Sequence, residues 1–166
     1  LLLLFCSGCT DFDFSLAQKT VDRSDPLLAE QSGVLLLHGT PFSGLVVERD
    51  GDKLRSKTPY RKGLRHGRAY AYHPDGRLAY EKLFRNGNRE GTHRGWWPNG
   101  TLQFTYTYEH DLFEGEETSY YKNGVRAELR HYRKGREEGQ QTTWNGDGQI
   151  VSNYTIKEGK LYGIVG

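Results

Sequence analysis

The side chains that could do chemistry are two cysteines, six histidines and two groups of carboxylates. The histidines show no HxxxH or HExxH spacing, so the sequence predicts no metal centre; they are His38, His66, His73, His93, His110 and His131. The carboxylates of residues 114–117 and 137–138 would need a cleft that separates their pKa values before they could act as acid and base. We therefore expect a protein that is not an enzyme and that uses no cofactor and no small-molecule substrate.

Both cysteines lie in the first nine residues, which read LLLLFCSGC. An apolar run followed by small residues is typical of the end of a secretory signal, and this run is too short to span a membrane. Ser7-Gly8-Cys9 resembles the bacterial lipoprotein cleavage box, whose cysteine becomes the lipidated first residue. That resemblance implies a signal remnant over 1–8, lipid attachment at Cys9 and an outer-membrane location on the cell surface or the periplasmic face. The alternative is a Cys6–Cys9 disulfide, or a CxxC redox or metal pair.

Charge is distributed unevenly after the cysteines. Residues 10–33 are polar and acidic, so we expect a lipidated cysteine and acidic tether over 9–33. Asp25 and Pro26 suit the cap and first position of a short helix over 26–31. Residues 49–94 carry thirteen Lys and Arg against five Asp and Glu. This excess is either a solvated sheet edge or an anion-binding surface, for which the candidates are Arg61, Lys62, Arg65, Arg68, Arg85 and Arg89.

A 24-residue repeat organises the rest of the chain, over 34–166. Among the 166 residues are 21 Gly, 11 Tyr, 7 Phe and 3 Trp but no Met, a composition that favours strands and turns. Glycines recur in three columns, and Asp111 is the exception in the first; the columns are Gly39, Gly63, Gly87, Gly135 and Gly159, then Gly67, Gly91, Gly115, Gly139 and Gly163, then Gly76, Gly100, Gly124 and Gly148. Such regularity predicts a repeat array.

The glycines mark turns, because HPDG, WPNG, YKNG and NGDG each place Asp or Asn directly before a glycine. We predict a three-residue loop in which Pro74-Asp75 form a type I turn and Gly76 adopts a left-handed conformation. In that register Tyr72 faces Leu78 and Tyr70 faces Tyr80, and in the next unit Trp96 faces Leu102. Each unit is then a β-hairpin.

This register places most aromatic side chains on one face of a sheet. The residues expected there include Tyr70, Tyr72, Tyr80, Phe84, Phe104, Tyr106 and Tyr108, with Lys82 as an exception. We expect His73, Trp97 and Tyr121 on the opposite face, together with Leu83, Leu129 and His131. Because Trp and Tyr often dominate protein recognition, His73, Trp97 and Tyr121 are the candidate partner-binding residues.

The units YRKGLRHGRAYAYHPDG and YEHDLFEGEETSYYKNG resemble the MORN repeat. They are most similar to a 24-residue bacterial variant found in proteins labelled as antitoxins, and the resemblance covers roughly residues 36–163. It implies an all-β fold, a single elongated antiparallel sheet of about ten strands built from repeated β-hairpins. It also implies roles in scaffolding, membrane association or attachment to other domains.

Our interpretation is a lipid-anchored outer-membrane lipoprotein that docks onto an envelope protein complex as a non-enzymatic scaffold. The first alternative is binding of an anionic lipid or glycolipid surface through the basic first half. The second is a cytosolic antitoxin-type inhibitor, if the leader is not processed. We expect no nucleic-acid partner.

Overall fold

The computed structural model describes residues 19–165, and every regular element within them is a β-strand. The expected signal remnant, Cys9 and the first part of the expected tether lie outside the described residues. Within residues 19–165 we find no helix that could cross a membrane.

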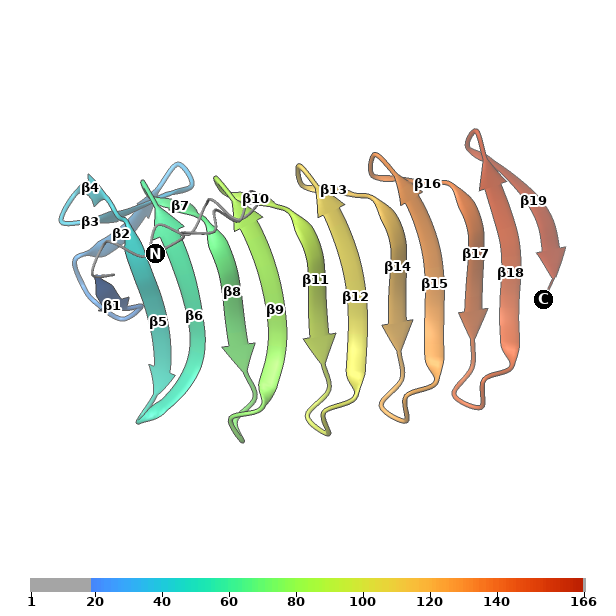
Figure 1. Cartoon of the computed structure of the whole chain (residues 1–166), viewed down its shortest axis with the longest axis horizontal. Coiled ribbons are helices and arrows are strands. Elements are labelled where there is room, and N and C mark those ends of the chain that lie inside the picture. The colour runs from blue at the N-terminus through green and yellow to red at the C-terminus, as the bar shows by residue number, and fades with distance from the viewer. Residues whose placement is uncertain (1–18, 166) are drawn as a thin grey trace, which may run out of the picture.

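One elongated sheet forms most of the molecule, which confirms the predicted fold class. Its long strands follow one another in chain order along a single axis (Figure 1). They are β5 (Gly44–Asp50), β6 (Lys53–Arg61), β8 (Gly67–Tyr72), β9 (Leu78–Arg85), β11 (Gly91–Trp96), β12 (Leu102–Glu109), β14 (Gly115–Tyr120), β15 (Arg126–Arg133), β17 (Gly139–Trp144), β18 (Ile150–Lys157) and β19 (Lys160–Val165). All these neighbours are antiparallel, and only β1 (Thr20–Asp22) joins in parallel, along β5.

The turns at one margin of the sheet have the predicted three-residue loop. The Gly76 amide donates to the His73 carbonyl at 2.9 Å, and the His73 amide donates to the Arg77 carbonyl at 2.8 Å. Gly76 has a φ of 87°, a left-handed conformation that glycine adopts without steric cost. Tyr72 pairs with Leu78, so the prediction for the loop and its first cross-strand pair is confirmed.

The turns at the opposite margin are two-residue hairpins. Lys62 and Gly63 both have positive φ, 51° and 79°, as a type I′ turn requires, and Arg61 pairs with Leu64 across it. The chain therefore folds back for two residues before the next repeat starts. The short strands formed in this way are β7 (Leu64–Arg65), β10 (Asn88–Arg89), β13 (Leu112–Phe113) and β16 (Arg136–Glu137).

A β-bulge in each hairpin changes the predicted assignment of faces. The register shifts after Ala71, so that Ala71 pairs with Tyr80, and Tyr70 pairs with Glu81. The expected Tyr70–Tyr80 pair is therefore wrong, because Ala79 is an extra residue opposite the partner strand. The same shift occurs between Gly95 and Trp96 and in the later hairpins.

Cross-strand partners share a face and neighbours along a strand alternate, so the registers define two faces. The aromatic face carries Tyr80, Lys82 and Phe84 of β9, Phe104, Tyr106 and Tyr108 of β12, and Glu128, Arg130 and Tyr132 of β15. The threonine face carries Thr92 and Arg94 of β11, Thr105 and Thr107 of β12, and Thr118 of β14. Tyr70 and Tyr72, which we expected beside Tyr80, instead lie on the threonine face.

The first end of the sheet holds the main apolar core. Strands β2 (Leu28–Gln31), β3 (Val34–Leu37) and β4 (Thr40–Pro41) form a second, small sheet there (Figure 1). The buried residues of this cluster are Val21, Leu35, Leu37, Phe42 and Val46, with Leu28 and Tyr60 packed against them. Residues 20–33, which we expected within the tether, thus contribute strands and core side chains.

The expected helix over 26–31 is wrong. Asp25 does cap the backbone, since its carboxylate accepts the Leu27 amide at 2.9 Å, but what it caps is a single turn. Leu28–Gln31 then runs as strand β2 against β3. The pairing with Val34–Leu37 outweighs the weak local preference of residues 26–31 for a helix.

The two glycines Gly63 and Gly87 hold the same turn position but have different surroundings. We expect Gly63→Ala to lower the free energy of unfolding more than Gly87→Ala, measured by urea denaturation. Both changes incur the left-handed cost of about 1–2 kcal/mol. A Cβ at Gly63 would also lie 2.3 Å from Val34 Cγ1 and 2.8 Å from the Leu35 carbonyl, whereas at Gly87 the nearest atom is 3.7 Å away. Overpacking adds about 1–3 kcal/mol. Equal losses of unfolding free energy in the two variants would contradict the close packing of Gly63 against Val34 and Leu35.

Candidate interaction surfaces

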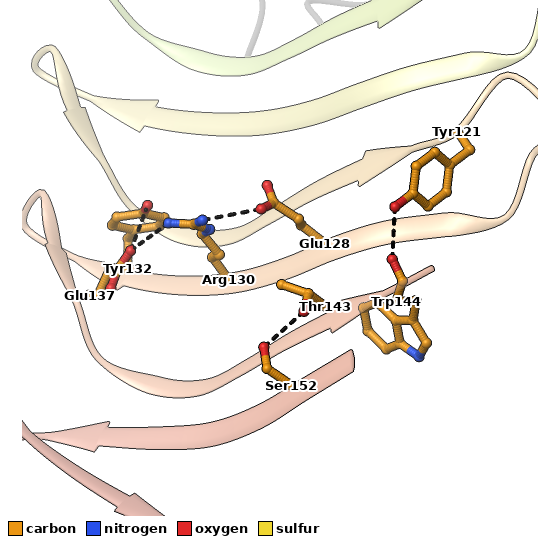
Figure 2. A network of polar contacts seen from close by, with 8 residues as sticks. All are labelled: Tyr121, Glu128, Arg130, Tyr132, Glu137, Thr143, Trp144 and Ser152. Carbon is orange, nitrogen blue, oxygen red and sulfur yellow. Dashed lines mark hydrogen bonds and ion pairs between the residues drawn. The ribbon is translucent and has the colours of Figure 1, made fainter. Parts of the chain in front are cut away.

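Histidine and aromatic side chains at the loop margin link each repeat to the next. His73 Nε2 bonds to the Trp96 carbonyl at 2.8 Å, and Trp97 Nε1 donates to the Tyr120 carbonyl at 2.9 Å. The Tyr121 hydroxyl donates to the Trp144 carbonyl at 2.9 Å (Figure 2). All three candidate partner-binding residues therefore have a structural role. Tyr121 is nevertheless 38% exposed, and a partner contact for this column stays a prediction.

The six candidate anion-binding residues do not share one face. Arg68 lies on the threonine face, where it forms an ion pair with Glu81 of the neighbouring strand. Arg65 and Arg89 instead stack over aromatic rings of the aromatic face, on Phe84 and Tyr108 respectively. Arg61, Lys62 and Arg85 are exposed at the type I′ margin.

Arg89 also explains the one missing glycine of the first column. Asp111 adopts a φ of 66°, and its carboxylate accepts the Arg89 amide at 2.8 Å and the Arg89 Nε at 3.0 Å. Arg89 Nη2 donates to the Asp111 carbonyl at 2.9 Å. The backbone hydrogen bond from Arg89, with its guanidinium, lowers the pKa of the Asp111 carboxyl. These bonds offset the conformational cost that a non-glycine residue has there.

A hollow of about 210 Å³ opens on the aromatic face over β7–β12. Its lining combines three cations with aromatic walls; it comprises Arg65, Lys82, Phe84, Arg89, His93, Phe104, Tyr106, Tyr108 and Asp111. Lys82 was not among our candidates, although it was the one break in the expected aromatic pattern. Burial lowers the pKa of Lys82, and the positive charges of Arg65 and Arg89 lower it further.

The same face becomes acidic farther along the array. Arg130 bridges two carboxylates, with Nη2 at 3.1 Å from Glu128 and Nη1 at 2.8 Å from Glu137 (Figure 2). The Tyr132 hydroxyl donates to Glu137 at 3.3 Å, and burial raises the pKa of Tyr132 to about 12. Glu117 pairs with Arg130 across β14 and β15, and burial raises the pKa of its carboxyl.

The threonine face has a wider and more open trough, of about 630 Å³. It is lined by Thr92, Arg94, Thr105, Thr107, Glu114, Gly115, Glu116, Thr118, Tyr120 and Arg126. Two arginines and two glutamates balance each other here. Within residues 19–165 no group of three or more His, Cys, Asp or Glu is placed to hold a metal ion.

His93 supplies a polar bond inside the aromatic face. The side chain is 2% exposed, and its Nε2 donates to the Leu83 carbonyl at 2.8 Å. Its ring lies between Phe84 and Tyr108, with centroids 5.7 Å and 4.7 Å away. Two repeats later Gln141 occupies the same column and donates to the His131 carbonyl at 3.2 Å. Each carbonyl also accepts a backbone amide, that of Glu90 at Leu83 and that of Glu138 at His131. The two side chains thus add a second hydrogen bond beside the short ladder between repeats, where β9 and β11 share only two paired positions.

Three segments match the MORN repeat variant family, residues 65–86, 89–110 and 113–134. Their spacing agrees with the 24-residue period, and they support a MORN-repeat protein. MORN repeats generally serve as protein- or membrane-interaction modules and are generally non-catalytic. No curated protein matches the chain.

His93 predicts a loss of stability in mild acid. Burial lowers the pKa of its imidazole in the folded state. The unfolded chain then binds the proton more readily, so the free energy of unfolding falls as the pH drops through the ordinary histidine pKa of about 6.5. The loss levels off below the folded-state pKa. We expect His93→Gln, which can donate to Leu83 as Gln141 donates to His131, to flatten this dependence in urea titrations between about pH 7 and pH 5.

His110→Gln is the matched control, because His110 is exposed. It should keep the pH dependence of the native chain. A His93→Gln variant with an unchanged pH profile would contradict the buried neutral imidazole.

Proposed function

We propose that this chain is a lipid-anchored docking scaffold of the bacterial outer membrane that binds an envelope protein complex and catalyses no reaction. One observation carries the proposal. The sheet is a single layer, and over β8–β18 neither broad face is covered by another element of the described chain. Both faces present partly exposed aromatic and charged side chains on a backbone that the repeats hold in fixed register.

The anchor is supported by the sequence Ser7-Gly8-Cys9. Lys19, where the described structure begins, follows Cys9 by ten residue-to-residue steps. An extended chain of that length spans at most about 35 Å, which sets an upper limit on the distance between the lipid and the first described residue.

Anionic lipid binding is the second candidate function. The observation in its favour is the exposure of Arg61, Lys62 and Arg85 along one margin. Contacts between exposed charges weaken steeply as salt rises, because the Debye length is about 8 Å at physiological ionic strength. A contact centred on aromatic side chains should tolerate the same salt.

Intact mass and membrane fractionation of the natively expressed protein test the anchor. We expect a chain that starts at Cys9 with a diacyl or triacyl mass and sediments with membranes. Cys9→Ala should abolish the lipid mass and shift the protein to the soluble fraction. A native protein that is soluble, unlipidated and still carries residues 1–8 would contradict the anchor and favour the cytosolic antitoxin-type inhibitor.

Tyr121 tests whether the loop margin contacts a partner. Affinity purification in mild detergent should recover envelope proteins with the native chain. Tyr121→Phe keeps the ring and removes the hydroxyl that bonds to Trp144, at a cost of about 1 kcal/mol in stability. We expect it to retain the partner. Tyr121→Ala removes the ring, and a hot-spot loss of about 2 kcal/mol would weaken capture about thirtyfold.

Thermal melts of both variants separate binding from folding. If Tyr121→Ala captures the partner as well as Tyr121→Phe does, the contact lies elsewhere on the sheet. If native protein recovers no envelope protein, the docking function itself is wrong.

A further inference from the structure

We propose that the hollow bounded by Arg65, Lys82 and Arg89 on the aromatic face is an oxyanion site that receives the carboxylate of an acidic peptide segment. The peptide belongs to the docked protein, so this inference rests on the proposed docking function. It adds the chemistry of the partner and the place where it binds.

Charge in the hollow is unbalanced. Asp111 is the one carboxylate of the lining, and Arg89 uses it through its backbone amide and its guanidinium. Arg65 and Lys82 form no ion pair within residues 19–165. Three positive charges therefore face one negative charge in a partly enclosed space, and an incoming carboxylate would relieve their repulsion.

Aromatic rings hold these cations in place before a ligand arrives. The Arg65 guanidinium lies 4.4 Å from the Phe84 ring centroid, and that of Arg89 lies 4.3 Å from the Tyr108 centroid. The Lys82 ammonium lies 4.3 Å from the Tyr80 centroid. Ordered donors lose less conformational entropy on binding than free side chains do. An arginine fork also suits a carboxylate geometrically.

The repeat does not require this cluster. The positions equivalent to Lys82 are occupied by Tyr106, Arg130 and Tyr154. The positions equivalent to Arg65 and Arg89 are occupied by Phe113, which stacks on Tyr132 at 5.0 Å, and by Glu137, which binds Arg130. Each of these alternatives fills the same backbone frame without excess positive charge. The three cations meet at one pair of repeats only, within the described chain.

The shape of the face favours a peptide over a membrane. A broad anionic surface lying on the aromatic face would meet the hollow and also Glu117, Glu128 and Glu137, which lie farther along the same face and would be repelled. A peptide segment can contact the hollow alone. The volume of about 210 Å³ suits a carboxyl group with a short apolar stem against the walls of Phe84 and Tyr106, and it is smaller than the usual pocket for a drug-sized molecule.

Solution NMR on the full chain tests the site with defined probes. The acidic probe is acetyl-Gly-Asp-Phe-Glu-Gly-amide, and its neutral counterpart is acetyl-Gly-Asn-Phe-Gln-Gly-amide. We expect saturable shifts of the Lys82 ammonium and of the Arg65 and Arg89 Nε signals with the acidic peptide alone. The affinity should fall as salt rises.

Lys82→Met keeps the length of the side chain and removes its charge. We expect it to weaken binding of the acidic peptide about tenfold or more. It should not unfold the chain, because it removes an ammonium that burial and like charges already destabilise. Arg68→Gln is the matched control, since Arg68 pairs with Glu81 on the other face, and it should bind as the native chain does.

Any of four results would overturn the inference. The first is the absence of saturable binding of the acidic peptide at millimolar concentration. The second is equal binding by Lys82→Met. The third is Lys82-dependent binding to vesicles of phosphatidylcholine and phosphatidylglycerol without peptide binding, which would assign the hollow to lipid phosphates. The fourth is capture of envelope proteins by Lys82→Met at the native level, in which case the docking function stands and the oxyanion site does not.

Discussion

The structure depends on one constraint, which is that a single-layer sheet has no second layer to bury its side chains. Only the N-terminal end of the sheet has such a cover, where the small sheet β2–β4 packs around the cluster of Leu35 and Phe42. Elsewhere each repeat must be held by the next one. At one margin the side chains of His73, Trp97 and Tyr121 bond to the next repeat. At the other margin the turn-glycine amides connect the repeats, as when the Gly87 amide donates to the Arg65 carbonyl. Stability in such an array accumulates from neighbour to neighbour.

The centre of the aromatic face is partly polar, because buried side chains there hydrogen-bond to the backbone. The carbonyls of Leu83 and His131 accept the backbone amides of Glu90 and Glu138, and each has a second lone pair open to side-chain donors. His93 and Gln141 provide them at equivalent positions. Glu117 occupies that column in the repeat between, and its raised pKa reflects the burial of a carboxylate beside Glu128 and Glu137. Apolar side chains here would forgo that second hydrogen bond, which contributes a net of about 0.5–1.5 kcal/mol to stability.

The sequence is informative where the backbone itself limits the choice of residue. Glycine after Asp or Asn predicts the loop at Pro74-Asp75-Gly76 because few residues tolerate a left-handed conformation. The sequence does not predict the bulge at Ala79, because alanine is not a residue type that marks a bulge. That single extra residue places Tyr72 on the face opposite to the one expected. The bond of Asp111 to Arg89 joins residues of neighbouring repeats, and only the folded register places them together. Lys82 and Asp111 are visible in the sequence as exceptions to the repeat. Their roles depend on contacts with neighbouring repeats, which only the folded structure shows.

The repeat thus separates the residues that build the frame from those that vary on it. Turn glycines and margin hydrogen bonds recur every 24 residues, whereas one column of the aromatic face reads Lys82, Tyr106, Arg130 and Tyr154. Because the frame is unchanged, each substitution alters charge locally without moving the backbone. The aromatic face consequently changes from basic around Lys82 to acidic around Glu128 within two repeats. A face that reverses its charge over that distance is suited to a partner with its own pattern of charge, and poorly suited to a uniform anionic surface.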